Sequence, residues 1–304
     1  MEIKTILITG GAGFIGQNLV HYLLENTDCK VIVLDDASNS DPESLPKEVE
    51  FVSGDVTKYE DCVYIKADAI VHLAAQTSVP YSMTEPLFDA HINIMGITNM
   101  LEIARQRKVQ KFIFASSNAV IGDTAILPIT EDMNTYPISP YGVSKLSSEY
   151  YCKLYHNVFG LPTICLRFSN IYGQYSQYKN SVIPKFIKQI ENNEVIEVYG
   201  DGKQTRDFLY ATDLAEAITK AIFLNNKLPD IFCVASGVET TINQLLDILA
   251  NIYGIDLKIN YVPYRDGDIK YNYSSIKKAK RILKWKPTTS LRDGIIELIE
   301  SKKL

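Results

Sequence analysis

Short apolar runs alternate with segments of helical periodicity over the first half of the chain. The apolar runs predict strands at residues 4–9, 30–35, 49–55, 69–74, 111–117 and 163–170. Helical spacing predicts helices at residues 13–26, 82–107 and 140–158. Strands that are apolar on both faces and separated by helices are typical of a parallel sheet covered on both sides. The pattern therefore predicts an α/β fold with a doubly wound parallel sheet.

The second half of the chain is less regular. It predicts helices near residues 181–191, 212–224, 241–253, 275–283 and 290–301, and short strands near residues 196–199, 231–235 and 257–262. We expect two parts, residues 1–170 and residues 171–304, with a soft boundary because no linker composition separates them. The smaller C-terminal α/β part is expected to interleave with the first part and to form one wall of a cleft.

Composition narrows the class of protein. The 304 residues are 46% hydrophobic and 22% charged, and the formal net charge of −5 comes from scattered residues of both signs. We therefore expect neither a nucleic-acid partner nor a membrane partner. The N-terminus runs directly into a strand pattern without the features of a signal peptide, which favours a cytoplasmic protein. Five dispersed cysteines and four histidines show no ligand spacing, so we expect reduced thiols and no metal site.

Three glycines follow the first predicted strand and open the first predicted helix. In a Rossmann phosphate loop, Gly10 would allow the tight turn, Gly13 the approach of a pyrophosphate, and Gly16 close packing of helix on sheet. The helix N-terminus would supply N–H groups and a positive dipole. The alternative is a turn with a purely structural role, and the acidic residue that follows the second strand argues against it.

Polar and small residues end the next three strands. Asp35 ends the second strand about 20 residues after the glycines, where a carboxylate accepts both ribose hydroxyls of an adenosine. It would repel a 2′-phosphate, and Asp36 adds to that repulsion, so the sequence favours NAD over NADP. Asp55 ends the third strand and residues 72–75 end the fourth, at the edge where open α/β sheets bind ligands.

A tyrosine and a lysine stand four residues apart at the start of the third helix. Ser139 is a predicted N-cap and Pro140 suits the first helical position. Tyr141 and Lys145 then share one helix face, about one turn apart. A phenol beside a cation has a lowered pKa and can transfer a proton. The alternative is two unrelated surface residues, because this spacing arises often by chance.

Together with Ser117 after the fifth strand, these features resemble the extended short-chain dehydrogenase/reductases. Within that group the chain is similar to the NAD-dependent nucleotide-sugar epimerase/dehydratase family, and in particular to the 4-epimerases of UDP-glucose and UDP-N-acetylglucosamine. The resemblance covers nearly the whole chain, since "GDGKQTRDFLYATDLAEAI" (200–218), "RDGD" (265–268) and "AKRILKWKPTTSLRDGI" (279–295) look like later family segments.

The resemblance implies roles for individual residues. Tyr141 would be the catalytic acid/base, Lys145 would bind the nicotinamide ribose and lower the pKa of the phenol, and Ser117 would share a hydrogen bond with the reacting oxygen. The implied cofactor-binding residues are Gly10, Gly13, Phe14, Ile15, Gly16, Asp35, Asp36, Asn39, Asp55, Val56, Leu73, Ala74, Ala75, Asn93, Tyr141 and Lys145. The implied substrate-binding residues are Ser78, Ser117, Asn118, Tyr141, Asn170, Ser181, Val182, Tyr199, Arg206, Arg265 and Asp268.

The shared step of the family is removal of hydride from C4 of the sugar, giving a 4-keto intermediate. Asn118 and Ala119 stand where 4,6-dehydratases have Asp-Glu, so the sequence favours 4-epimerisation of a nucleotide sugar. Uridine is adopted as the family's common base, which makes the expected substrate a UDP-hexose. The alternatives are a 4,6-dehydratase, a UDP-uronate epimerase, a reductase or, less favoured, a non-catalytic NAD-binding protein. Ile121 replaces a tyrosine that is frequent in the family, which affects the expected placement of the substrate.

Two finer expectations come from the same resemblance. Asn272 matches the position that gates the C2 substituent, and its size favours room for an N-acetyl group; a shift of one residue would put Tyr271 or Tyr273 there instead. A homodimer is expected, because the family pairs the long helix with the Tyr-Lys helix. Apolar residues over 92–104 are compatible with that pairing, although packing against the sheet explains them equally.

Overall fold

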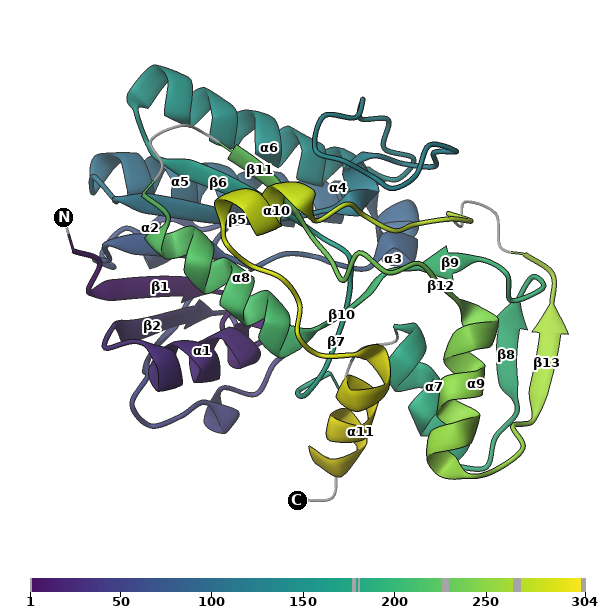
Figure 1. Ribbon diagram of the computed structural model, residues 1–304. Helices are drawn as coiled ribbons and strands as arrows, with labels where there is room; N and C mark the ends of the chain where they lie inside the picture. The colour runs from purple at the N-terminus through teal and green to yellow at the C-terminus, as the bar shows by residue number, and fades with distance from the viewer. Residues whose placement is uncertain (1, 177–178, 180, 226–229, 265–268, 302–304) are drawn as a thin grey trace.

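The computed structural model describes residues 2–176, 179, 181–225, 230–264 and 269–301. Over these residues, seven parallel strands form one sheet in the order β11-β6-β5-β4-β1-β2-β3 (Figure 1). The strands are β1 (Thr5–Thr9), β2 (Lys30–Asp35), β3 (Glu50–Ser53), β4 (Ala69–His72), β5 (Lys111–Ser117), β6 (Thr163–Phe168) and β11 (Asp230–Val234). The order reverses next to β1, as in a doubly wound fold, and the predicted fold class is confirmed.

Helices cover both faces of this sheet. One face packs against α1 (Phe14–Asn26), α8 (Ala211–Phe223) and α10 (Lys277–Ile282), and the other against α5 (Gly96–Gln106) and α6 (Pro140–Phe159) (Figure 1). Neighbouring residues of a strand enter opposite cores: Ile6 and Ile8 face α1, while Leu7 faces α5. Burial on both faces explains why the strands appear as continuous apolar runs.

One strand lies away from its predicted place. Residues 231–235 were assigned to the C-terminal part, but β11 pairs in parallel with β6 and completes the edge of the main sheet. Its preceding helix, α8, packs beside α1. Segments from both halves of the chain therefore build the main sheet, while the division at residue 170 stays a prediction.

The remaining C-terminal segments form a smaller unit with its own apolar core. Its helices are α7 (Val182–Glu191), α9 (Ile242–Tyr253) and α11 (Leu291–Ser301). Its paired strands are β7 (Asn170–Tyr172) with β10 (Phe208–Tyr210), β9 (Thr205–Arg206) with β12 (Thr240–Thr241), and β8 (Ile196–Tyr199) with β13 (Ile259–Val262). Four of these strands have only two or three residues, too few for a periodic pattern to predict.

The predicted long helix over 82–107 is interrupted. The structure has α3 (Val79–Thr84), α4 (Pro86–Ala90), a π-helical turn (His91–Met95) and then α5. Glu85, at ψ 61°, leaves helical geometry because Pro86 disfavours the α conformation of the residue before it. The wide turn that follows places Asn93 inward, where it is buried against α6. Short helices at η1 (Pro42–Ser44), α2 (Tyr59–Cys62) and η3 (Asn118–Val120) complete the elements.

Helix α6 has the predicted extent but an unexpected orientation. The apolar positions that define its period, including Val143, Leu154 and Val158, are about half exposed or more. Its polar positions Tyr141, Lys145 and Glu149 are buried against the sheet. Within the described residues, no helix combines the length and apolar character needed to cross a bilayer.

Candidate active site

The predicted phosphate loop has the close contacts that require glycine. Gly10 has φ +69°, and a Cβ there would stand 2.6 Å from the backbone nitrogen of Ala74. Gly13 caps α1 in extended geometry. At Gly16 a Cβ would stand 2.4 Å from the carbonyl oxygen of Gly10. The loop, the start of α1 and the segment after β4 are therefore in direct backbone contact.

We expect Gly16→Ala to lower the free energy of unfolding by about 1–3 kcal/mol, because the new methyl group meets backbone atoms that cannot rotate away. NAD content should fall as well, since the turn from Gly10 to Gly13 would have to shift. Urea unfolding and the nucleotide released on denaturation measure the two effects. Gly13→Ala is the matched control for stability, because its Cβ would lie 3.3 Å from the same carbonyl. Equal stability of the two variants would contradict the steric explanation.

Asp35 is held at the end of β2 beside this loop. One carboxylate oxygen accepts a hydrogen bond from the Ala12 N–H at 3.0 Å, and the other accepts bonds from the Ala37 N–H and the Ser40 hydroxyl, also at 3.0 Å. Asp36 and Asn39 are exposed next to it. The structure thus fixes the carboxylate at the C-terminal end of the strand, where an adenosine ribose would lie.

The other predicted cofactor residues follow the same edge of the sheet. Asp55 accepts hydrogen bonds from the N–H and hydroxyl of Thr57, and Val56 is buried against Gly96. The Leu73 N–H donates to the carbonyl of Thr9 at the end of β1. The structure places the remaining members in the loop and first turn of α1 and in the segment after β4: Phe14, Ile15, Ala74 and Ala75.

Ser117, Tyr141 and Lys145 come together where β5 ends. The hydroxyl of Ser139 accepts a hydrogen bond from the Gly142 N–H at 3.1 Å, and this N-cap starts α6 beside the strand. The Ser117 and Tyr141 hydroxyls share a hydrogen bond. The Lys145 ammonium donates to the carbonyl of Ala115 at 2.9 Å and lies 5.7 Å from the centroid of the Tyr141 ring. All three predicted catalytic residues therefore form one cluster.

The electrostatics of this cluster differ from the expectation. Burial raises the pKa of Tyr141 to about 12; the hydrogen bond from Ser117 opposes this and the charge of Asp89 adds to it. Burial lowers the pKa of Lys145 to about 8. The predicted lowering of the phenol pKa by Lys145 is thus not found in the protein alone, where burial is the largest influence on the pKa of Tyr141. The phenol is protonated at neutral pH.

The predicted substrate residues lie on several elements around the cluster. Ser78 caps α3, and Asn118 donates a hydrogen bond to the Ser274 hydroxyl at 2.8 Å. Asn170 begins β7, and Arg206 ends β9 and donates to the carbonyl of Thr205. Ser181 precedes α7, Val182 begins that helix, and Tyr199 ends β8 under the Lys185 ammonium. Arg265 and Asp268 lie outside the described residues.

Asn118 connects the cluster to the smaller unit. Its side chain donates to Ser274 and, at 3.3 Å, to the side-chain oxygen of Asn272. The Asn272 N–H in turn donates to the Thr205 hydroxyl, next to Arg206. Ser78 and Tyr199 show no such direct link to Asn118 among the hydrogen bonds of the described residues. Of the substrate candidates, Asn118 is therefore connected by hydrogen bonds, through Asn272 and Thr205, to the strand that carries Arg206.

Residues 6–235 match the NAD dependent epimerase/dehydratase family. The chain belongs to this family. It is 32% identical over 305 residues to the UDP-glucose 4-epimerase of Mycolicibacterium smegmatis, covering 97% of each protein. Its structure also resembles two solved epimerases over nearly their full length. These are the UDP-N-acetylglucosamine 4-epimerase of Methanobrevibacter ruminantium M1 in complex with UDP-N-acetylmuramic acid (TM-score 0.93, 32% identity, 100% of each chain) and the UDP-glucose 4-epimerase of Thermotoga maritima with UDP-glucose (TM-score 0.94, 34% identity, 98% of each chain).

NAD is the cofactor of the epimerase/dehydratase family, so the predicted cofactor is confirmed. The residues present fit it. Three glycines leave backbone exposed at the start of α1, where a Cβ would collide with neighbouring backbone at two of them. The Asp35 carboxylate stands beside them, and the hydrogen bond from Ala12 ties it to the loop.

Sequence patterns missed several polar residues of the site. Asp89 is fully buried on α4, where Gln76 donates to it directly and Asn93 links it to Ser144. Nothing in their spacing distinguishes them from surface positions. Asp207 could have been identified from the sequence, because it lies in the segment over 200–218 that resembles the family. Its carboxylate accepts hydrogen bonds from the backbone N–H groups of residues 236, 237 and 274, and so holds the strand segment that faces Asn118.

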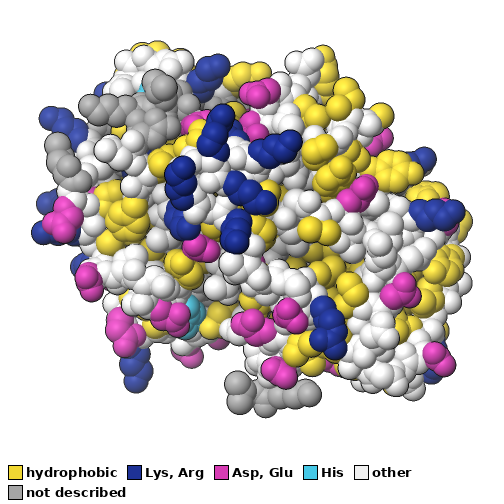
Figure 2. Space-filling view, viewed as in Figure 1, with side chains coloured by type: hydrophobic (Ala, Val, Ile, Leu, Met, Phe, Trp, Pro, Cys, Tyr) yellow, Lys and Arg dark blue, Asp and Glu magenta, His cyan; other side chains and the backbone are white. Residues whose placement is uncertain are grey.

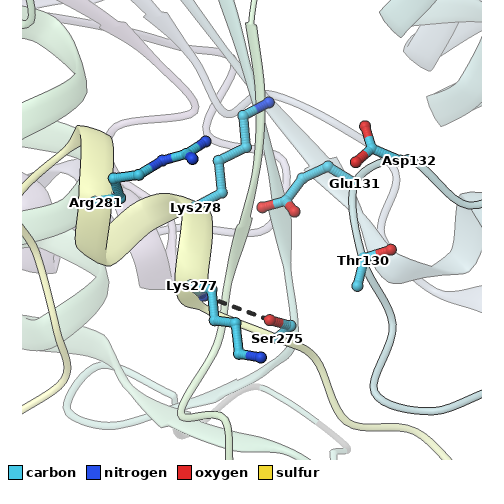
Figure 3. Close-up of a pocket in the computed structure, with 7 residues that line it drawn as sticks. All are labelled: Thr130, Glu131, Asp132, Ser275, Lys277, Lys278 and Arg281. Atoms are coloured by element: carbon cyan, nitrogen blue, oxygen red, sulfur yellow. Dashed lines mark hydrogen bonds between the residues drawn. The ribbon is translucent and has the colours of Figure 1, made fainter.

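A cavity of about 520 Å³ lies elsewhere, between α10 and the segment at residues 130–132. Figure 3 shows Lys278 and Arg281 on one wall and Glu131 and Asp132 on the other. On the face seen in Figure 2, Lys and Arg side chains gather over this region. The cavity contains neither Ser117 nor Tyr141, and its walls carry both signs of charge. The candidate active site at the C-terminal edge of the sheet is therefore separate from this cavity.

Proposed function

We propose that the protein is an NAD-dependent 4-epimerase of a UDP-hexose, interconverting UDP-glucose and UDP-galactose or their N-acetyl counterparts. The observation that carries the proposal is the cluster of Ser117 with the buried Tyr141 and Lys145 at the end of β5. The sequence relationship to proteins named 4-epimerases supports it.

Gly10, Gly13 and Asp35 would hold NAD, which when bound would supply the acceptor and donor of the hydride exchanged at C4 of the sugar. Tyr141 takes the proton of the C4 hydroxyl and later gives it back. Ser117 is placed to donate a hydrogen bond to the C4 oxygen, while in the protein alone its bond to Tyr141 favours the ionised phenol. The Lys145 ammonium, next to the Tyr141 ring, stabilises negative charge there. No net oxidation results, so the bound NAD serves repeated turnovers.

The residues after Ser117 argue against elimination of water from the sugar. A 4,6-dehydratase needs an acid and a base near C5 and C6. Asn118 is an amide whose N–H groups are engaged by Ser274 and Asn272, and Ala119 has no polar group. The 4-keto sugar formed here therefore has one favoured fate, which is return of the hydride.

The candidate substrates differ in the substituents at C2 and C6 of the sugar. Asn272 is buried against Asn118, whereas the Tyr271 side chain is about half exposed, which supports Asn272 as the residue near C2 and room for an N-acetyl group. A UDP-uronate is the second candidate, and Lys179 favours it. The Lys179 ammonium donates to the Thr77 hydroxyl at 3.0 Å, beside Ser78, and could bind a carboxylate at C6.

The proposed oligomeric state of the protein is a homodimer. Val143, Leu154 and Val158 form an exposed apolar face on α6, and Met95 is also exposed on the adjacent π-helical turn. Pairing of these helices with a second copy would bury that surface. Arg206 and Arg265 are proposed to bind the diphosphate of the substrate, Asp268 is proposed as a further substrate-binding residue, and residues 171–304 are proposed to contribute most of the nucleotide-sugar contacts.

The test is proton NMR of purified protein with UDP-galactose, UDP-GalNAc or UDP-galacturonate and no added cofactor. Growth of the anomeric signal of the gluco-configured product in one sample would support the proposal and identify the C2 and C6 preference. Signals of a 6-deoxy-4-keto sugar would instead identify a dehydratase. Absence of conversion in all three samples, with and without added NAD, would overturn the proposed substrates.

A further inference from the structure

Asp89 on α4 is a buried carboxylate that the proposed chemistry does not use. It is 0% exposed. One oxygen accepts hydrogen bonds from the Gln76 side chain at 2.7 Å and the Asn93 side chain at 3.1 Å. The other oxygen is buried and has no hydrogen-bond partner among the described residues. A buried carboxylate without a paired cation is costly to desolvate, so its presence calls for an explanation.

Hydrogen bonds connect Asp89 to the first turn of the catalytic helix. The Asn93 amide that donates to Asp89 also donates to the Ser144 hydroxyl at 3.1 Å, and that hydroxyl donates to the carbonyl of Tyr141 at 2.9 Å. The Gln76 N–H donates to the side-chain oxygen of Asn93 at 2.9 Å. Through Gln76 and Asn93, Asp89 therefore connects the segment after β4 to the first turn of α6.

The charge of Asp89 also reaches the reactive pair. It raises the pKa of Lys145 against the effect of burial, and it adds to the raised pKa of Tyr141. Among the described residues, His72 at the end of β4 is a further titratable group that interacts with Lys145. Burial lowers the pKa of His72 to about 3, so its ring is neutral over the working range. On α6, the buried Glu149 is paired with Arg167.

We propose that Asp89 is a positioning residue of the active site, which fixes Gln76 and Asn93 against the first turn of α6 and places a negative charge on the hydrogen-bond chain that leads to Tyr141. The inference rests on the proposed function for its kinetic test. It assigns to Asp89 two separable effects, one of geometry and one of charge.

Asp89→Asn separates these effects. Its side-chain oxygen can accept the same two hydrogen bonds, so the charge is lost while both acceptor contacts are kept. Without that charge both Tyr141 and Lys145 lose protons more easily, and we expect both limbs of the kcat–pH profile to move to lower pH while KM stays within about twofold of wild type. Asp89→Leu removes the acceptor too, and should raise KM in addition.

Glu85→Gln is the matched control, because Glu85 is an exposed carboxylate four residues earlier and its profile should stay unchanged. If Asp89→Asn is not folded, Asp89→Ser takes its place, since it removes the charge and leaves room for water. A profile of Asp89→Asn identical to wild type, or one displaced to higher pH, would overturn the inference.

A second readout does not depend on epimerase activity. Tyrosinate absorbance that is lost in Tyr141→Phe reports ionisation of this phenol directly, and in Asp89→Asn it should appear at lower pH than in wild type. If the wild-type protein converts no UDP-hexose, the proposed function fails while this titration still decides the role of Asp89. An unchanged titration midpoint would count against that role.

Discussion

Tyr141→Phe is expected to lower kcat for the UDP-sugar about 10²–10⁴-fold, because it removes the hydroxyl proposed to exchange a proton with the C4 oxygen. The aromatic ring remains, so the Lys145 ammonium keeps its contact and its hydrogen bond to Ala115. KM and the content of NAD should therefore change little. Steady-state kinetics by NMR and the nucleotide released on denaturation measure these quantities.

Tyr150→Phe is the control for this variant, since Tyr150 lies on the same helix with its side chain largely exposed. It should behave as wild type. If Tyr141→Phe retained more than a tenth of the wild-type kcat, another group would have to carry the proton and the catalytic assignment would be wrong.

Arg167→Met should give the largest loss of stability, about 3–5 kcal/mol in the free energy of unfolding. Arg167 on β6 and Glu149 on α6 form a salt bridge of 2.8 Å, and their side chains are 3% and 4% exposed. Removing the guanidinium leaves a buried, uncompensated carboxylate on the helix that carries Tyr141. Equilibrium unfolding in urea measures the loss, with the slope of the transition checked for two-state behaviour.

The exposed ion pair between Lys30 and Glu50 provides the comparison. Lys30→Met also removes the cation of an ion pair, but the carboxylate left behind is exposed to water. It should therefore lower the free energy of unfolding much less. The double variant Arg167→Met/Glu149→Leu should recover most of the stability, because neither charge is then left alone. Equal losses for Arg167→Met and Lys30→Met would contradict the explanation.

The main sheet could be predicted because burial of its strands produces apolar runs that are visible within short segments of the sequence. Its inner strands coincide with apolar runs because they are buried on both faces, whereas the edge strand β3 is mostly exposed. The phosphate loop was predictable for the same reason: backbone contacts at Gly10 and Gly16 admit no side chain, and that requirement is visible in the sequence. Spacing along a single helix was also enough to bring Tyr141 and Lys145 together.

The sequence-based predictions are wrong where contacts between distant segments of the chain determine the structure. The long helix breaks at Pro86, and the π turn behind it is stabilised by contacts of Asn93 with α6 that no local pattern shows. The apolar spacing of α6 predicted a helix, but the side toward the sheet is the polar one, because it carries buried Lys145 and the paired Glu149. Asp89 gave no signal, since its partners come from residues 76 and 93.

The late position of β11 in the sequence has a consequence for synthesis of the chain. β6 is complete long before residues 230–234 emerge from the ribosome, so its outer row of N–H and C=O groups stays unpaired while the smaller unit is being made. An open, apolar strand edge is a template for pairing with other chains. We expect nascent chains stalled before residue 230 to aggregate or to recruit chaperones, and chains extended past β11 to escape both.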